Sequence, residues 1–133
     1  MAPQKWIATA ALLAGTGVIA GAFGAHALKD QLVASDHLET WNTAVLYQVW
    51  HALGLLIWAV QREAGRGVGG LGIAGCFVIG TLLFSGSLYC LSLPIADSLP
   101  SMFGALTPLG GVFLIAGWGL YGVGSLRRPR AEA

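Results

Sequence analysis

Four apolar runs, each free of Asp, Glu, Lys and Arg, constrain the fold of this chain more than any other feature. They cover residues 6–28, 41–60, 68–93 and 108–126, and each is close to the roughly 20 residues with which a helix spans the hydrocarbon core of a bilayer. The chain is 56% hydrophobic and only 10% charged, which is too little charge to cover a water-soluble domain. The sequence therefore predicts an all-α integral membrane protein, a four-helix transmembrane bundle formed as a single domain over residues 1–133.

The first run also has features of a secretory signal peptide. Lys5 would serve as its basic start, and Ala20–Gly21–Ala22 or Ala25–His26–Ala27 would serve as its cleavage site. The apolar run is longer than an ordinary signal sequence, so we favour a retained membrane span.

The basic residues predict how the chain is oriented. With four spans, both termini and the turn at residues 61–67 share one side of the membrane, which then holds six of the seven basic residues; Lys29 lies on the other side. Such an excess is typical of the cytoplasmic side, so both termini are predicted to be cytoplasmic in a multi-pass protein of the inner membrane. The six residues are Lys5, Arg62, Arg66, Arg127, Arg128 and Arg130.

The positions of the charged residues and the net charge also exclude some classes of function. All charged residues lie outside the spans, which argues against a proton or ion pump, and a net charge of +1 argues against nucleic-acid binding. Several glycine-rich stretches fit the dinucleotide-binding pattern, including residues 67–72 and 117–122, but none follows a strand, so we discard them. Cys76 and Cys90 would lie roughly 21 Å apart on one helix and could not form a disulfide.

The connections carry their own signals. Leu28, Leu32 and Val33 predict a short amphipathic turn on the membrane surface within residues 29–40. Prolines prevent residues 94–107 from forming one regular helix, and Thr107–Pro108 is typical of a helix start. Trp41 and Trp58 lie where the two membrane interfaces would meet the second span.

Small residues repeat along the predicted spans. This spacing places them on one helix face and lets neighbouring backbones approach closely. We expect these seams to hold the four spans together, and the alternative is that one seam forms a homodimer. The predicted packing residues are Gly17, Gly21 and Ala25 in the first span and Gly72, Cys76 and Gly80 in the third, with Gly110, Gly117 and Gly124 repeating in the fourth.

Polar side chains inside the spans form the predicted site. Tyr47, Gln48 and His51 share one face of the second span, and polar residues of the third span lie at a similar depth. The sequence predicts a cluster that opens away from the cytoplasm and either fixes helix register or binds a lipid headgroup or small molecule. Its members are His26, Tyr47, Gln48, His51, Ser85, Ser87 and Tyr89.

Ordered motifs in all four spans carry a resemblance to a known family. They are Phe23–Leu28 (FGAHAL), Trp41 with Tyr47–Gln48 and His51–Gly54, Phe84–Tyr89 (FSGSLY) and Thr107–Gly111 (TPLGG). Together they resemble the YgdD-like family of small membrane proteins over nearly the whole chain. The resemblance implies an inner-membrane protein and supplies no reaction, because the family is a domain of unknown function.

Three functions stay open. The first is a non-enzymatic membrane protein without a cofactor, whose polar cluster organises the bundle or receives a lipid or small partner, within a homo-oligomer or a larger membrane complex. The second is an oligomeric transporter or channel with a discontinuous helix at the start of the fourth span. The third is a redox module with His26 and His51 as haem ligands. A metal site from His26, Asp36, His37 and Glu39 lacks a recognised ligand spacing.

Overall fold

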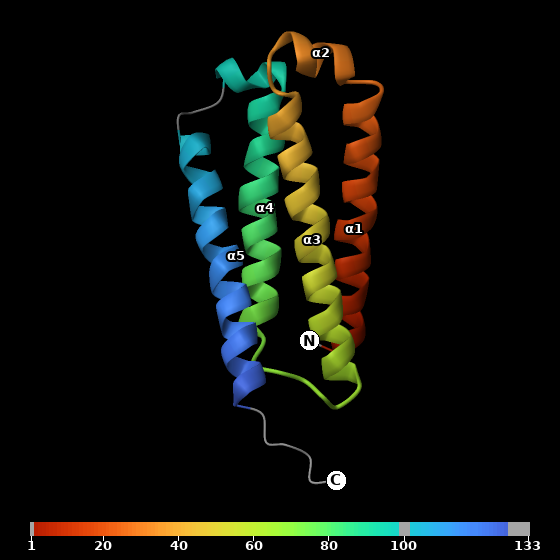
Figure 1. Cartoon of the computed structure of the whole chain (residues 1–133), viewed down its shortest axis with the longest axis vertical. Helices are drawn as coiled ribbons and strands as arrows, with labels where there is room; N and C mark the ends of the chain where they lie inside the picture. Colours follow the sequence, from red (N-terminus) through yellow and green to blue (C-terminus); the bar gives the residue numbers. More distant parts are fainter. Residues whose placement is uncertain (1, 99–101, 128–133) are drawn as a thin grey trace.

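Long helices run the length of the molecule, and two short helical segments lie at one end (Figure 1). The computed structural model describes residues 2–98 and 102–127; Pro100, one of the prolines of the connection at 94–107, and the basic residues Arg128 and Arg130 lie outside them. The long helices are α1 (Pro3–Ala25), α3 (Leu38–Glu63), α4 (Gly72–Ser92) and α5 (Met102–Leu126). The short ones are α2 (Lys29–Ala34) and the 3-10 helix η1 (Pro94–Ser98).

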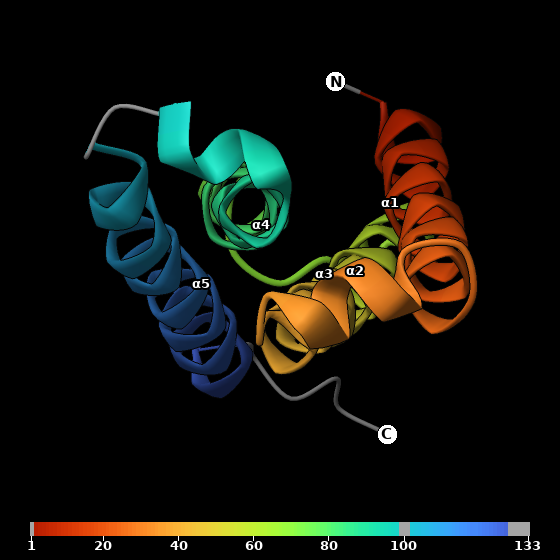
Figure 2. The same cartoon turned by 90° about the horizontal axis from the view of Figure 1, so that it is seen from above.

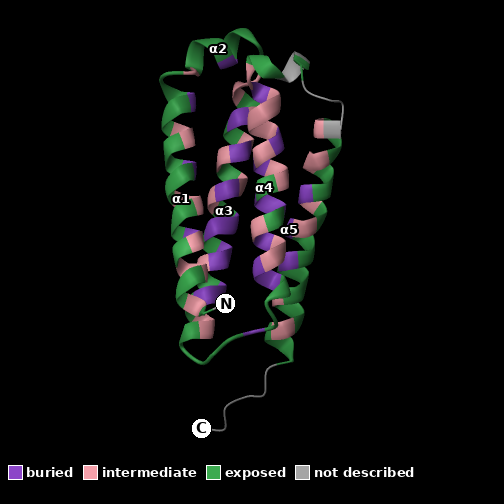
Figure 3. Cartoon of the chain, turned by 180° about the vertical axis from the view of Figure 1, so that it is seen from behind, coloured by how far each residue is buried: buried purple, intermediate pink, exposed green. Residues whose placement is uncertain are grey.

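The four long helices are each long and apolar enough to cross a membrane. The predicted all-α fold with four membrane spans is therefore confirmed. Extensive contacts join α1 to α3, α3 to α4 and α4 to α5. Seen from above, α1 and α5 lie at the two ends of this series (Figure 2). Buried residues accordingly concentrate on α3 and α4, which form the inner pair (Figure 3).

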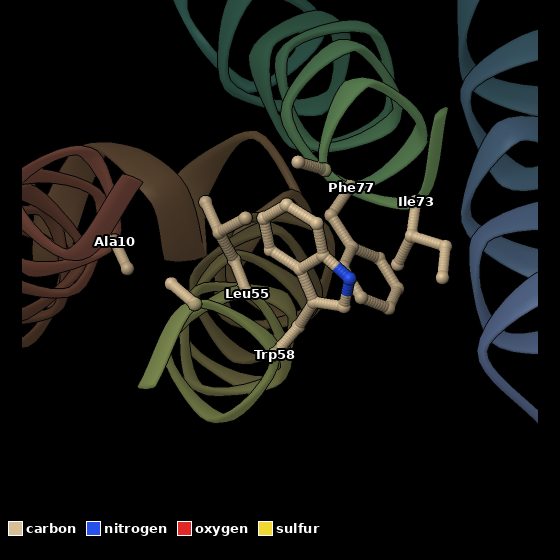
Figure 4. Close-up of a cluster of buried hydrophobic side chains, with 7 residues drawn as sticks. Ala10, Leu55, Trp58, Ile73 and Phe77 are labelled. Atoms are coloured by element: carbon tan, nitrogen blue, oxygen red, sulfur yellow. The ribbon is translucent and has the colours of Figure 1, made fainter. Parts of the chain in front are cut away.

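An apolar core fills the half of the molecule nearest the chain termini. Leu55 and Trp58 of α3 pack with Ile73 and Phe77 of α4, and Ala10 reaches them from α1 (Figure 4). These side chains are no more than 1% exposed. Burying a large apolar side chain contributes about 1.5–3 kcal/mol, so this cluster is the main apolar contribution to that half.

Both tryptophans that were predicted to lie at the depth of the membrane interfaces have their side chains buried within the protein. Trp58 is 0% exposed, and its indole N–H donates to the carbonyl of Val68 at 2.9 Å. Trp41 is 6% exposed and donates to the carbonyl of Ala20 at 2.9 Å. Each indole therefore holds a neighbouring segment through its N–H, which explains why tryptophan occupies a position inside the bundle.

Several helix boundaries differ from the predicted ones; α1 begins at Pro3, and α3 extends three residues beyond each predicted end. α1 ends at Ala25, because His26 turns the chain and its N–H caps the carbonyl of Ala22. α4 begins at Gly72, not at residue 68, because Gly69 has a φ of +62° and lies in a loop held by Trp58 and Arg62.

α5 begins at Met102, so Thr107 and Pro108 lie inside this helix and do not start it. Proline removes one backbone hydrogen bond from the helix interior. Thr107 is not a cap, because its hydroxyl contacts Ser87 of α4. The helix is continuous from Met102 to Leu126. The discontinuous helix that the transporter hypothesis placed at the start of the fourth span is therefore absent from these residues.

The short amphipathic segment is present as α2. Leu32 is 0% exposed and anchors α2 to the bundle, whereas Val33 is 55% exposed. Leu28 precedes the helix and is partly buried, so two of the three predicted apolar residues face the protein.

We expect the cytoplasmic side to be the end that carries both termini. The check uses single cysteines in a chain whose Cys76 and Cys90 are replaced by alanine. In spheroplasts, an impermeant maleimide should label Ala34→Cys in α2 and should leave Ala64→Cys, in the turn after α3, unlabelled until the membrane is opened. Both positions are exposed in the structure, so burial does not explain a difference. The opposite pattern would overturn the orientation.

Candidate functional site

Gln48 connects three helices in the middle of the molecule. Its amide nitrogen donates to the carbonyl of Leu13 at 2.8 Å and to the hydroxyl of Thr16 at 2.9 Å, both in α1. Its amide oxygen accepts from the hydroxyl of Tyr89 in α4 at 3.0 Å. Gln48 is 7% exposed, so these bonds lie in a dry environment where an unpaired amide would be costly. One α3 side chain therefore bridges the two helices on either side of it.

Trp41 extends this bridge toward the end of the bundle that carries α2. Its ring packs on Tyr89 with centroids 4.7 Å apart, and its N–H bonds to α1 through Ala20. Tyr89 thus contacts Trp41 through its ring and Gln48 through its hydroxyl. We call Thr16, Trp41, Gln48 and Tyr89 the Gln48 network.

His51 belongs to a different, aromatic cluster. Its Nδ1 donates to the carbonyl of Tyr47 at 2.6 Å, one turn back on the same helix. Its ring lies 6.0 Å from Phe77 and 6.1 Å from Trp118 between centroids. Tyr47 in turn stacks on Phe84 with centroids 4.5 Å apart. The predicted cluster therefore divides, with Gln48 directed to α1 and α4 and His51 directed to α4 and α5.

The remaining predicted members are further separated. Ser87 and Thr107 pair through their hydroxyls at 2.6 Å and join α4 to α5. Ser85 is 1% exposed, and its hydroxyl has no partner among the described residues. His26 is exposed at the end of α1 and joins neither group. The sequence pattern placed these residues on a common helix face or at a similar depth in the membrane. In the structure they take part in contacts between different pairs of helices.

A cavity of about 340 Å³ lies beside Gln48, between α1 and α4. We call it the α1–α4 cavity. Gln48 and Tyr89 line it, and the other residues come from the two flanking helices. They are Leu13, Thr16 and Ala20 of α1 and Thr81, Leu82 and Gly86 of α4. On the other side of the inner pair, Trp118 of α5 packs against Phe77 and His51 and fills the corresponding space.

Thr81 is the unusual residue of this cavity. It is 2% exposed, and its hydroxyl has no hydrogen-bond partner among the described residues. Thr16 and Thr81 were not among the predicted site residues. The available signal was a hydroxyl residue near the middle of an apolar run. A threonine hydroxyl can bond a carbonyl of its own helix, so this signal alone does not distinguish a site residue.

The predicted seams of small residues pack against neighbouring helices of the same chain. A Cβ on Gly17 would lie 2.8 Å from Val49, and the contact continues through Gly21 and Gly24, so this face of α1 packs on α3. Ala25 is exposed, and the seam continues through Gly24 instead, because a helix face advances by three or four residues.

The second seam joins α4 to α5. A Cβ on Gly80 would lie 2.5 Å from Leu114, and one on Gly117 would lie 3.2 Å from Cys76. Gly72 lies outside this seam, since it is exposed at the first turn of α4 and a Cβ there would meet nothing within 4 Å. Both predicted seams therefore face partners in the same chain, which favours bundle packing over a homodimer through them.

Two cofactor hypotheses find little geometric support. His26 lies at the end of α1 beside the start of α3, and His51 lies thirteen residues into α3, which is about 20 Å along the helix axis. One haem could not use both as axial ligands at that separation. Within residues 2–98 and 102–127, no three His, Cys, Asp or Glu side chains come together as a metal site.

A larger cavity, of about 470 Å³, lies between residues 69–73 and α5 at the terminal end of the bundle. Its single charged lining residue is Arg127, which is exposed. The loop carbonyls of Val68 and Gly69 already accept from Trp58 and Arg62. The α1–α4 cavity differs because polar side chains from three helices, Thr16, Gln48 and Tyr89, line it.

Comparison with known proteins gives a consistent result. The family described as "Protein of unknown function (DUF423)" matches residues 20–111. The UPF0382 membrane protein YwdK of Bacillus subtilis is 43% identical over 74% of this chain and 76% of its own length. The UPF0382 membrane protein SSP2132 of Staphylococcus saprophyticus is 39% identical over 93% of this chain and 98% of its own.

The UPF0382 inner membrane protein YgdD of Escherichia coli K12 is 38% identical over 85% of this chain and 82% of its own length. No solved structure matches the chain. The predicted resemblance to the YgdD-like family and the predicted multi-pass location in the inner membrane are confirmed.

Proposed function

Because this chain belongs to the UPF0382 (DUF423) family of membrane proteins, whose function is unknown, we propose that it is a non-enzymatic membrane protein that binds a small lipid-soluble molecule in the α1–α4 cavity. The observation that carries this proposal is the α1–α4 cavity itself, where the polar side chains of Thr16, Gln48 and Tyr89 stand in an otherwise largely apolar lining.

The size and lining of the cavity fit such a molecule. Its volume of about 340 Å³ lies at the small end of the range for ligand pockets, which begins near 300 Å³. Apolar side chains such as Leu13 and Leu82 line it together with a few polar groups, which is the usual composition of a ligand pocket. The polar groups lie in the interior of long apolar helices, so a molecule would enter from the lipid.

The proposal is tested by filling the cavity. A Cβ on Gly86 would meet nothing within 4 Å, so Gly86→Leu should place its side chain in the cavity without disturbing the helices. Gly75→Leu is the matched control, because it lies on the same helix, is equally open and does not line this cavity. Each protein is purified in lipid nanodiscs and its bound small molecules are extracted and identified by mass spectrometry.

We expect one lipid-soluble compound to be enriched with the wild type and with Gly75→Leu, and to fall at least fivefold with Gly86→Leu. If no compound is enriched over empty nanodiscs, or if Gly86→Leu retains it, the cavity is not a binding site.

A further inference from the structure

Trp50 exposes its indole ring near the middle of the membrane. Of the five tryptophans it is the one nearest the centre of its helix, about 18–20 Å from either end of α3, and it is 51% exposed. Its N–H makes no hydrogen bond with the described residues, whereas those of Trp41 and Trp58 donate to carbonyls. Tryptophan in membrane proteins ordinarily lies near the interfaces, and hydrocarbon offers no acceptor. Trp50 therefore presents a donor at a depth where lipid cannot satisfy it.

His51, the next residue, presents the matching acceptor. Its Nδ1–H donates to the carbonyl of Tyr47, so Nε2 carries the free lone pair of the neutral ring. His51 is only 5% exposed, but its Nε2 makes no hydrogen bond within residues 2–98 and 102–127 and is not one of the polar atoms that the protein encloses completely. The ring of Tyr47 contacts the rings of both Trp50 and His51, with centroids 5.6 and 5.8 Å apart. The donor and the acceptor therefore belong to one continuous aromatic surface.

The two groups cannot bond to each other within one chain. Consecutive residues of a helix point about 100° apart, so the side chains of Trp50 and His51 do not face each other. A second copy related by a twofold axis removes this difficulty, because residue i of each copy then contacts residue j of the other. Both copies are inserted in the same direction, so the donor of one lies at the depth of the acceptor of the other. Two reciprocal bonds result.

The face of α3 around Trp50 has the spacing of a helix-pairing seam. α1 and α4 pack on the other sides of α3 (Figure 2). Leu46, Trp50, Leu53 and Ile57 follow one another at intervals of four, three and four residues, and each is 46–52% exposed. This is the spacing with which two helices pack side by side in a coiled coil. Lipid would cover the apolar members equally well, so the donor and acceptor at the centre of the seam are what favour a second copy.

We infer that two copies of this chain pair through this face of α3 as a parallel twofold dimer, in which the Trp50 N–H of each copy donates to the His51 Nε2 of the other. The interface is not one of the glycine seams, since those pack within the chain. It is also separate from the α1–α4 cavity, because His51 contacts Trp118 on the other side of the inner pair. The dimer and the proposed function can therefore fail independently.

Pairing is measured by energy transfer between donor-labelled and acceptor-labelled chains in lipid vesicles, as the protein is diluted with lipid. The labels are attached to Ala64→Cys in a chain whose Cys76 and Cys90 are replaced by alanine. One hydrogen bond between membrane helices changes an association constant by about threefold, so losing two should weaken pairing about eightfold. We expect this loss with Trp50→Phe and with His51→Phe. Trp50 is exposed, so Trp50→Phe leaves the bundle intact, and unchanged pairing of this variant would overturn the inference.

A mixture of the two variants tests the reciprocal bonds directly. The Trp50→Phe chain keeps the acceptor and the His51→Phe chain keeps the donor, so a mixed pair retains one of the two bonds. After the statistical factor for mixed pairing, we expect the mixed pair to form about threefold more tightly than either variant with itself. If the mixed pair only matches the mean of the two variants, the side chains do not bond between copies and the inference is wrong.

Two isoleucine truncations test which face pairs. Ile57 lies on the α3 seam and Ile115 lies on α5, and they are 52% and 74% exposed, so neither Ile57→Ala nor Ile115→Ala opens the core. Pairing should weaken with Ile57→Ala and stay unchanged with Ile115→Ala. Equal effects, or a wild type that is monomeric at every ratio of protein to lipid, would overturn the inference. So would a lipid-soluble compound that copurifies with a monomeric wild type and is lost with Trp50→Phe, because it would then occupy this face.

Discussion

Replacing Gly110 with alanine is expected to force α5 away from α4 and to lower the free energy of unfolding by about 3 kcal/mol, the upper end of the usual cost of overpacking. An added Cβ would meet backbone atoms, namely the amide nitrogen of Phe84, its Cα at 2.8 Å and the carbonyl oxygen of Gly80 at 2.9 Å. Backbone atoms inside a helix cannot rotate away as a side chain can. The whole helix pair must therefore separate, including the Ser87–Thr107 hydrogen bond.

Gly119→Ala provides the matched control on the same helix. A Cβ there would meet nothing within 4 Å, and alanine restricts the unfolded chain, so this variant should be as stable as the wild type or slightly more stable. The measurement is reversible unfolding in mixed micelles with increasing SDS. If Gly110→Ala and Gly119→Ala unfold at the same SDS fraction, α4 and α5 do not approach as closely as the structure shows.

The membrane spans could be predicted from the sequence because their cause is local. Each needs only an uncharged apolar run of sufficient length, and all four are present. Their ends were less accurate because tertiary contacts decide them. Val68 and Gly69 looked like part of an apolar span, but Trp58 and Arg62 hold their carbonyls in a loop. Pro108 looked like a helix start, yet the helix begins six residues earlier.

The site could be predicted only in part, for the same reason. Gln48 and Tyr89 were identified because a polar residue in a membrane span needs a partner, and the structure joins them. Periodicity placed His51 on the same broad face, but that face touches two different neighbours, so His51 lies among aromatic rings of α4 and α5. Thr81 was missed because the sequence does not show whether a helical hydroxyl has a hydrogen-bond partner, and the hydroxyl of Thr81 has none among the described residues.

Replacing Gln48 with leucine is expected to lower the free energy of unfolding by about 2 kcal/mol, since three bonds of roughly 0.6 kcal/mol each are lost in a membrane helix contact. Leu13 and Thr16 would lose a donor, and Tyr89 would lose its acceptor. These bonds join α1 and α4 through α3, so α1 should be released first. Limited proteolysis at the α1–α3 connection, together with SDS unfolding, measures both effects.

Gln61→Leu is the control for removing a glutamine from the same helix. Gln61 accepts one bond, from the Tyr121 hydroxyl at 2.8 Å, so its replacement should cost about a third as much as Gln48→Leu, or roughly 0.6 kcal/mol. Equal losses for the two variants would mean that Gln48 does not act as a three-way connection.

A double-mutant cycle with Tyr89→Phe isolates the link between α3 and α4. Gln48→Leu strands the Tyr89 hydroxyl in an apolar site, and Tyr89→Phe leaves the Gln48 oxygen without its partner. The double variant removes both groups, so its loss should be smaller than the sum of the single losses by at least about 0.6 kcal/mol. Strictly additive losses would show that the two side chains act independently. In that case the polar side of the α1–α4 cavity would not be held in place by the Gln48 network.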